Sequence, residues 1–388
     1  MGNENASIYA QDGVDTKEGD SFSNFAGSIA RSTYGNSPFV EVHDFSDGHF
    51  RGPRGYRFIN LPRGCYSTIA PDGIGTKVVL IDACGRYTDA AADVLAMTAG
   101  DITRYGGIPL IFSNVLDVAA LDKVGNSANN AARQLMLGLK AVADSMKMVV
   151  LNGETAELSS CVGSENENAT LKFNWAGFVV GVFHPEWMIL GKTIRPGQKI
   201  MALRENGLGS NGVSTVRKAF KMRFGKNWPN EQEAQRYIKM AAAPSTIYDP
   251  FLVNLNWEHD QSSRITLHLI SHVTGGSIRD KLARDLLFRL GFSAVLDDLF
   301  EPPEIMWQCQ GWRNMSDADC YDTWNGGQRV LVVIDAQDVE KFEKIALTFG
   351  IETRMCGEIV STPKGKAPYV KINSKFKEGG EIVYQKGE

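Results

Sequence analysis

Residues 71–80, PDGIGTKVVL, place polar and glycine positions directly before an apolar run. These positions are Asp72, Gly73, Gly75, Thr76 and Lys77. The two glycines let a backbone approach a ligand closely, the threonine is a donor, and the lysine is a mobile cation. The aspartate has the chemistry to hold a hard divalent cation between phosphates. Taken alone, however, the segment fits a glycine turn between two strands better than it fits a phosphate site.

Two further carboxylates stand in comparable settings downstream of this segment. Asp101 comes late in the alanine-rich stretch 88–107, which the pattern predicts to be a helix. Glu154 follows Asn152 and Gly153 at the end of the apolar run MVVL, which reads as a strand. Magnesium is commonly held by one or two carboxylates together with nucleotide oxygens. Asp72, Asp101 and Glu154 are therefore the candidate metal ligands, provided that folding brings them together.

Length and charge narrow the class of protein. The chain has 388 residues and a formal net charge of -4, with no run of basic residues. At roughly 150 residues per domain the length predicts two domains. Neither nucleic acid nor an anionic membrane is an expected partner, because binding to either needs clustered Lys and Arg. A small molecule is the expected partner.

The chain carries no pattern typical of export or of membrane insertion. Its first 20 residues lack the basic flank and apolar core of a secretory signal, and no uninterrupted apolar run approaches the roughly 18 residues of a membrane span. The 6 cysteines form no CxxC pair and are expected to be reduced thiols. These features predict a soluble, cytoplasmic protein.

Strand-like and helix-like segments alternate along most of the chain, which predicts an α/β or α+β layered fold. Pro185, Pro196 and Gly197 interrupt the pattern, so the expected domains are residues 1–187 and 188–388. More locally, a helix is predicted over 20–32 with Asp20 as its cap, a long ordered loop or irregular edge over 36–56, and a surface connection over 226–235.

Two familiar nucleotide motifs are only partly matched. Gly207, Gly209 and Gly212 satisfy GxGxxG between a predicted strand and a predicted helix, but no acidic residue ends a second strand about 20 positions later. A Rossmann site is therefore excluded, and a glycine turn able to receive an anion remains. The segment 191-GKT-193 lacks the earlier glycine of a P-loop and is read as a turn.

Several blocks together resemble one enzyme family in order and spacing. They are PDGIGTKVVL, DVLAMTAGDITRYGGIPLIF, NGETAE, AGFVVGV, NGLGSNGVSTVRK, PSTIY, HVTGGS and YDTWNGG, with YAQDGVDTKEGD near the start. The family is aminoimidazole ribonucleotide synthetase, also called phosphoribosylformylglycinamidine cyclo-ligase. The resemblance runs from about residue 9 to about residue 360 and implies a homodimer of two-domain α/β subunits. In that fold the N-terminal mixed sheet forms a dimeric barrel, and helices pack the sheet of the C-terminal domain.

The resemblance also implies an activity: ATP-dependent ring closure of formylglycinamidine ribonucleotide in purine synthesis, with Mg²⁺. Three groups of residues carry the implied roles. Nucleotide and metal contacts fall on Asp72, Gly73, Gly75, Thr76, Lys77, Asp101 and Glu154; substrate contacts fall on Ser210, Asn211, Thr274, Gly275, Gly276 and Asn325; and the catalytic positions are Asp72, Lys77 and His272. For His272, a structural role at a strand end is an equal alternative.

The chain departs from the family pattern at several of these blocks. Gly100 stands where an asparagine is usual, Gly209 where a histidine is usual, Ser277 where a third glycine is usual, and Arg329 where a glycine is usual. The segment 40–58 replaces a Gly/Phe-rich loop. Two other functions therefore stay open: another ATP-using enzyme of the same superfamily, and a nucleotide-binding protein without turnover. Against the other ATP-using enzyme, no reactive cysteine is found in the N-terminal glycine region or at the C-terminus.

Overall fold

The computed structural model describes residues 16–46, 52–122, 124–258 and 265–387. Their contacts divide the chain into two compact units. The first unit holds the residues up to Ala99 together with Pro109–Val182, and the second holds Gly100–Ile108 together with the chain from Phe183 onward. Residues 9–15, where the family resemblance begins, and residues 47–51 of the segment 40–58 lie outside the described residues.

The chain forms these elements up to the end of the first unit: α2 Thr16–Ser32, β1 Val40–Asp44, β2 Arg54–Phe58, β3 Tyr66–Gly73, η1 Gly75–Lys77, α3 Val78–Cys84, η2 Tyr87–Asp89, α4 Ala90–Thr103, β4 Ile108–Val118, α5 Ser127–Ser145, β5 Val149–Glu157, η3 Ser159–Cys161 and β6 Phe173–Phe183. The helix predicted from residue 20 begins earlier, so Asp20 lies within α2 and is not its cap. Residues 40–44 and 54–58 pair as an antiparallel hairpin, where a loop or irregular edge was predicted.

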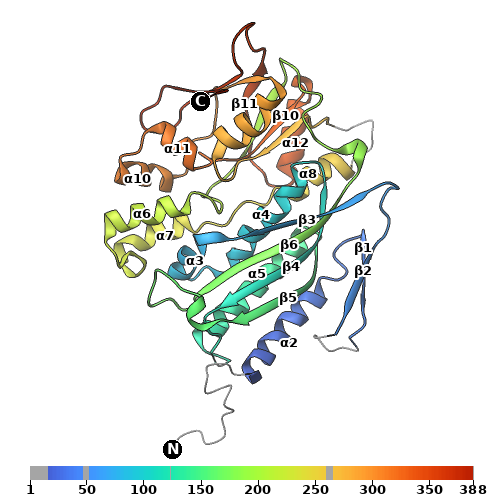
Figure 1. The fold of residues 1–388 in the computed structure, drawn as a ribbon, viewed down its shortest axis with the longest axis vertical. Coiled ribbons are helices and arrows are strands. Elements are labelled where there is room, and N and C mark those ends of the chain that lie inside the picture. The colour runs from blue at the N-terminus through green and yellow to red at the C-terminus, as the bar shows by residue number, and fades with distance from the viewer. Residues whose placement is uncertain (1–15, 47–51, 123, 259–264, 388) are drawn as a thin grey trace, which may run out of the picture. The chain divides into compact units, whose positions relative to one another are not determined.

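The first unit is built on a four-stranded sheet in the order β3-β6-β4-β5, with α2 and α5 packed on one face (Figure 1). Burial alternates along β6, so Phe173 and Trp175 face the helices while Asn174 and Phe178 face the other side. This second side is called the open face below. It is the side on which Ile69 of β3 and Phe178 are 65% and 44% exposed.

The second unit continues with η4 Pro185–Trp187, β7 Lys199–Arg204, α6 Val213–Phe224, η5 Trp228–Asn230, η6 Gln232–Ala234, α7 Gln235–Ala241, α8 Asp249–Val253, η7 Asn254–Glu258, β8 Leu269–His272, η9 Arg279–Leu287, α9 Phe288–Leu290, β9 Ser293–Leu296, α10 Glu304–Arg313, α11 Asp317–Thr323, β10 Gln328–Ile334, η10 Ala336–Asp338, α12 Val339–Thr348, β11 Thr353–Val360, β12 Tyr369–Asn373 and β13 Glu381–Gln385. The predicted surface connection 226–235 instead contains short helical turns, and Trp228 within it is fully buried.

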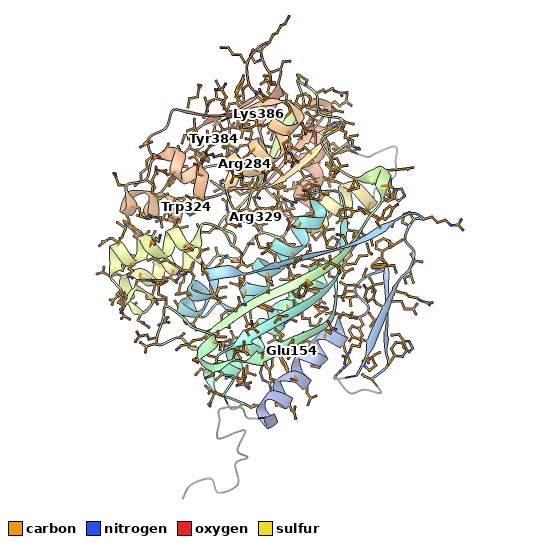
Figure 2. The ribbon with its side chains drawn as sticks, viewed as in Figure 1. Glu154, Arg284, Trp324, Arg329, Tyr384 and Lys386 are labelled. Carbon is orange, nitrogen blue, oxygen red and sulfur yellow. The ribbon has the colours of Figure 1, made fainter. Side chains whose placement is uncertain are left out.

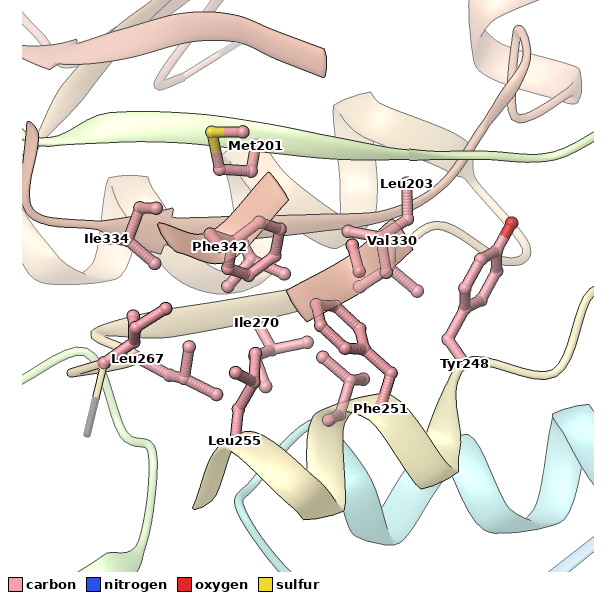
Figure 3. Packing of buried hydrophobic residues seen from close by; sticks show 14 of the residues in the cluster. Met201, Leu203, Tyr248, Phe251, Leu255, Leu267, Ile270, Val330, Ile334 and Phe342 are labelled. Carbon is pink, nitrogen blue, oxygen red and sulfur yellow. The ribbon is translucent and has the colours of Figure 1, made fainter. Parts of the chain in front are cut away.

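The seven-stranded sheet of the second unit has the order β13-β12-β9-β11-β7-β10-β8. Strand β10 is antiparallel to both β7 and β8. The carboxyl ends of β7 and β8 and the start of β10 therefore lie at one edge of the sheet. Strand residues such as Met201 and Val330 pack against Phe251 and Phe342, whose rings are 5.1 Å apart between centroids (Figure 3). This core supports the edge of the sheet at which β7 and β8 end and β10 begins, and three loops emerge from that edge.

The predicted mixed α/β fold, with helices packed on sheets, is confirmed. The dimeric barrel stays a prediction. No helix among the described residues is long and apolar enough to cross a membrane.

Candidate active site

The opening segment ends strand β3 and turns into α3. The Oδ1 atom of Asp72 accepts a hydrogen bond of 2.7 Å from the amide of Gly73. A side chain at residue 73 would meet Ala176 of β6 at 3.3 Å, so the close approach of the two strands favours glycine there. Gly75 has a φ of +62° with open space around it, and Thr76 is exposed. The turn thus presents a half-buried carboxylate beside an accessible glycine backbone and hydroxyl.

Lys77 differs from its expected role as a mobile cation. Its side chain is fully buried, and its Nζ atom lies 2.7 Å from Oδ1 of Asp93 on α4, which is buried as well. A lysine held this way is fixed within the first unit, because separating the pair would leave both charges in a medium of low polarity. The sequence expectation of mobility is wrong, and a contact between Lys77 and nucleotide remains a prediction.

Asp72 and Glu154 lie at opposite edges of the four-stranded sheet, on β3 and β5. Neighbouring strands are about 4.8 Å apart, so three spacings separate the two positions by about 14 Å. Strand alternation puts Asp72 on the side of buried Ala70. Glu154 pairs with Val115 of β4 and is exposed on the open face. Within one chain the two carboxylates therefore cannot ligate the same ion.

No group of three His, Cys, Asp or Glu side chains gathers as a metal site among the described residues. Asp101 lies in the last turn of α4, where Oδ1 is 3.3 Å from Nη2 of Arg104. Asp72, beside the open glycine turn, fits a magnesium ion that takes its other ligands from phosphate oxygens and water. The full trio of candidate ligands is not assembled within either unit described by itself.

Three loops converge at the sheet edge of the second unit. They are residues 205–212 after β7, 273–277 after β8 and 324–327 before β10. Gly275 lies beside Asn211, since a Cβ on the glycine would be 3.5 Å from Oδ1 of Asn211. The Nε1 atom of Trp324 donates to the carbonyl of Gly212 at 3.3 Å. The structure thus brings together the three blocks from which substrate contacts were predicted.

Polar groups of the glycine loops differ in their availability. The Ser210 hydroxyl is buried and forms no hydrogen bond with any described residue, so it is poised to receive an incoming group. Thr274 and Gly275 are on the accessible part of their loop. Gly276 has a φ of +78° and packs against Asp280, which explains its lack of a side chain. The geometry fits a ligand held by loop backbone and short hydroxyls.

The Asn325 side chain holds two loops together. It is buried, with Nδ2 donating to the Gly207 carbonyl at 3.1 Å and Oδ1 accepting from the Gly327 amide at 2.8 Å. In this structure Asn325 is a positioning residue, and a contact between its side chain and substrate remains a prediction. Glu205, which sequence reasoning missed, acts similarly by accepting from the Gly207 amide and from Thr246.

His272 is buried at the end of β8. Burial depresses the pKa of its imidazole well below the ordinary value, and the positive charges of Arg329, Arg104 and Lys281 depress it further. The ring is therefore neutral near pH 7 and cannot serve as a cation for phosphate. It packs on Gly100, where a Cβ would come within 3.1 Å of Nε2. The departure at residue 100 thus makes room for this ring.

The departures at Gly209 and Arg329 occur at one place. A Cβ on Gly209 would lie 3.1 Å from Cζ of Arg329 and closer still to Nη1. The Arg329 side chain, labelled in Figure 2, is fully buried and starts on β10. Its guanidinium group fills the space that a side chain at residue 209 would need. The glycine and the arginine are therefore one coupled change.

Asp249 carries the second signal that the sequence reasoning missed, a carboxylate directly after the PSTIY block. Burial raises its pKa to about 6, while a hydrogen bond from Thr103 at 2.7 Å and the charge of Arg329 act in the opposite direction. Since the folded-state pKa exceeds the ordinary value of 3.8, the native state binds the proton more tightly than the unfolded chain does. Its charge costs stability above pH 6.

Asp249→Asn keeps an oxygen that accepts from Thr103 and removes the charge. We expect the free energy of unfolding to rise by about 1–3 kcal/mol at pH 8 and to change little at pH 4, because the stability cost of the wild-type carboxylate grows between about pH 4 and pH 6. Urea denaturation at both pH values measures this difference, with Asp101→Asn, whose wild-type side chain is 39% exposed, as the control. An equal effect at the two pH values would contradict the assignment.

Most of the chain matches two domains of one known protein family. Residues 57–182 match the N-terminal domain of AIR synthase related protein, and residues 195–370 match its C-terminal domain. The chain belongs to the AIR synthase related family. The predicted family is thereby confirmed, and the two matched segments carry the loops described above.

Relatives of this AIR synthase related chain extend over nearly its full length. A phosphoribosylformylglycinamidine cyclo-ligase of Coxiella burnetii is 27% identical over 358 residues, 91% of this chain and 93% of the relative. The Methylobacillus flagellatus protein of the same name is 27% identical over 374 residues, 96% and 100% of the two chains. The structure of thiamine-monophosphate kinase from Stenotrophomonas maltophilia shares the fold, with a TM-score of 0.58, 11% identity and coverage of 90% and 96%.

Proposed function

We propose that the protein is an enzyme that closes the ring of formylglycinamidine ribonucleotide to give aminoimidazole ribonucleotide, using ATP and releasing ADP and phosphate. The observation that carries the proposal is the match of both halves to one family, together with relatives named for this cyclo-ligase over 91% or more of the chain. A ligase that forms a C–N bond in purine synthesis is the function these relatives' names support.

The reaction needs activation of a poor leaving group. Bound Mg²⁺–ATP would supply a phosphoryl group to the amide oxygen of the substrate, after which an amidine nitrogen attacks the same carbon and inorganic phosphate departs. Such chemistry depends on positioning and charge neutralisation more than on a covalent nucleophile. A neutral His272 and a set of glycine loops are consistent with that requirement.

Each group of residues has its own role in the proposal. Asp72 would hold magnesium, with the turn at Gly75 and Thr76 approaching the phosphates. The Ser210 hydroxyl and the loop at Thr274 and Gly275 would hold the substrate. The loop 205–212 would be kept in place by the contacts of Asn325 and Glu205 with Gly207. Glu154, distant from Asp72 within the chain, would act only at a site completed by another subunit.

A homodimer is part of the proposal. The open face of the four-stranded sheet carries the exposed apolar side chains of Ile69 and Phe178, which water solvates poorly. A second copy covering this face would bury them. Light scattering coupled to size exclusion should give twice the mass of the chain, and a monomer at micromolar concentration would contradict this part. The cytoplasmic location expected from the sequence stays a prediction.

Asp72→Asn tests the magnesium role. The amide keeps the size and the oxygen that accepts from Gly73 but loses the charge that attracts a hard cation. We expect affinity for ATP with Mg²⁺ to fall about tenfold or more, while the thermal midpoint without ligand stays within about 2 °C of wild type. Calorimetric titration and thermal scans measure both. A large fall of the unliganded midpoint would make Asp72 structural.

A substrate panel distinguishes this function from the two alternatives. ADP formation is measured with ATP, Mg²⁺ and either formylglycinamidine ribonucleotide, thiamine phosphate, selenide or a carbamoyl compound. The proposal expects stimulation by the ribonucleotide. Stimulation by another compound would assign a different superfamily activity, and nucleotide binding without stimulation by any of them would assign a protein without turnover.

A further inference from the structure

A pocket of about 360 Å³ lies in the second unit, and no residue of the three glycine loops lines it. It is enclosed by the helix formed by η9 and α9 on one side and by the end of β13 on the other. Figure 2 shows Arg284, Tyr384 and Lys386 gathered there. Its volume falls within the usual range for small-molecule sites, about 300–1,000 Å³.

The pocket is lined by four basic side chains and by no carboxylate. These four are Arg279, Arg284, Arg289 and Lys386. Three neighbouring carboxylates offset part of the charge. Asp322 lies 2.8 Å from Nη1 of Arg279, and Asp280 and Asp285 lie 3.1 and 3.6 Å from guanidinium nitrogens of Arg284. Each of these two arginines is thus already paired.

Arg289 and Lys386 differ from the paired arginines. Neither side chain forms an ion pair with any carboxylate of the described residues, and the Lys386 ammonium group donates to the Phe288 carbonyl at 3.2 Å. Both side chains are exposed to solvent at the pocket. Their charges are therefore available to an anion, and a guanidinium group with an ammonium group is the pair of donors that suits a phosphate.

The remaining walls are aromatic. The Phe288 and Tyr384 side chains line the pocket, and the Tyr384 hydroxyl is held by a hydrogen bond of 2.9 Å to Asp322. Rings fixed in this way offer apolar and π surface to a planar group. Phosphate and a planar ring are the two chemistries that a nucleotide combines.

One wall of the pocket lies beyond the matched family domains, while the helix on the other side lies within the C-terminal match. The C-terminal match ends at residue 370, whereas Tyr384 and Lys386 come from β13 and the residues that follow it. The hairpin of β12 and β13 pairs over Tyr369–Asn373 and Glu381–Gln385, and this pairing carries the two side chains to the helix. None of the lining residues belongs to the three glycine loops at 205–212, 273–277 and 324–327.

We propose that this pocket binds a nucleoside monophosphate, with the phosphate on Arg289 and Lys386 and the base against Phe288 and Tyr384. The paired Arg279 and Arg284 add long-range positive potential around the phosphate. The proposal does not depend on the function proposed for the glycine loops.

AMP is the probe that tests the site, titrated calorimetrically into the full chain in EDTA so that no magnesium-dependent nucleotide site is loaded. We expect one AMP per chain and binding of adenosine at least tenfold weaker, because the phosphate makes the charge-assisted bonds. The double variant R289Q/K386Q is expected to weaken AMP binding at least tenfold. Both positions are exposed, and thermal scans verify that the variant folds.

Two controls make the outcome specific. The variant R223Q/K226Q removes the same two residue types from an exposed part of the same unit and should leave AMP affinity within twofold of wild type. Asp72→Asn should also leave it unchanged, which separates this site from the proposed catalytic one. No AMP binding at millimolar concentration, equal binding of adenosine, or unaltered binding by R289Q/K386Q would each overturn the proposal.

Discussion

Lys77→Met is expected to lower the free energy of unfolding by about 3–5 kcal/mol, because it leaves the carboxylate of Asp93 buried without its cation. The Lys77 and Asp93 side chains are 0% and 1% exposed, with 2.7 Å between the charged atoms. Solvent cannot replace the lost partner at such a site. Urea denaturation of the purified variant measures the change.

Two companion variants isolate the cause. Lys77→Met combined with Asp93→Leu removes both charges and should recover most of the lost stability. Lys140→Met breaks an ion pair with Asp144 that is equally short, at 2.6 Å, but partly exposed to solvent. This variant should lose under about 1 kcal/mol in the free energy of unfolding. If Lys77→Met instead kept full stability and lost nucleotide binding, the main role of Lys77 would be to bind phosphate and not to stabilise the fold.

Asn325→Ala has the second largest expected effect, a loss of about 2–4 kcal/mol in the free energy of unfolding. The substitution removes two buried hydrogen bonds and leaves the Gly207 carbonyl and the Gly327 amide unsatisfied. Since these bonds hold the loop that carries Ser210, the substrate KM should rise about tenfold or more while affinity for ATP stays near wild type.

Asn325→Asp provides the control for that positioning role. It keeps an oxygen for the Gly327 amide but places a buried carboxylate oxygen against the Gly207 carbonyl, so at pH 7 its losses in stability and substrate affinity should be at least as large as those of Asn325→Ala. A change in stability without any change in KM would show that the loop does not depend on this side chain for substrate binding.

Local sequence predicted the elements that carry the site better than it predicted their side chains. The helix predicted after the glycine turn at 207–212 is observed as α6, and a strand was predicted where β5 begins. The burial of Lys77 could not be read locally, because its partner Asp93 is 16 positions away on α4. Only the packing of α4 against the turn makes the lysine a fixed charge.

The relation between Asp72 and Glu154 likewise depends on long-range pairing. Strand order puts β3 and β5 at opposite edges, and an irregularity at Leu151, between the pairs Phe112–Val150 and Ser113–Asn152, sets which face Glu154 occupies. No window of sequence contains that information. The same holds for His272, whose charge state follows from burial and from Arg329, a residue 57 positions later in the chain.

Single-turnover ring closure measures the proposed reaction itself. Excess purified protein is mixed with ATP, Mg²⁺ and limiting formylglycinamidine ribonucleotide, and aminoimidazole ribonucleotide and inorganic phosphate are quantified in the same quenched samples. We expect one phosphate to be released for each ring closed, with both products appearing at the same rate. Phosphate release without ring closure, or no consumption of the ribonucleotide while ATP still binds, would contradict it.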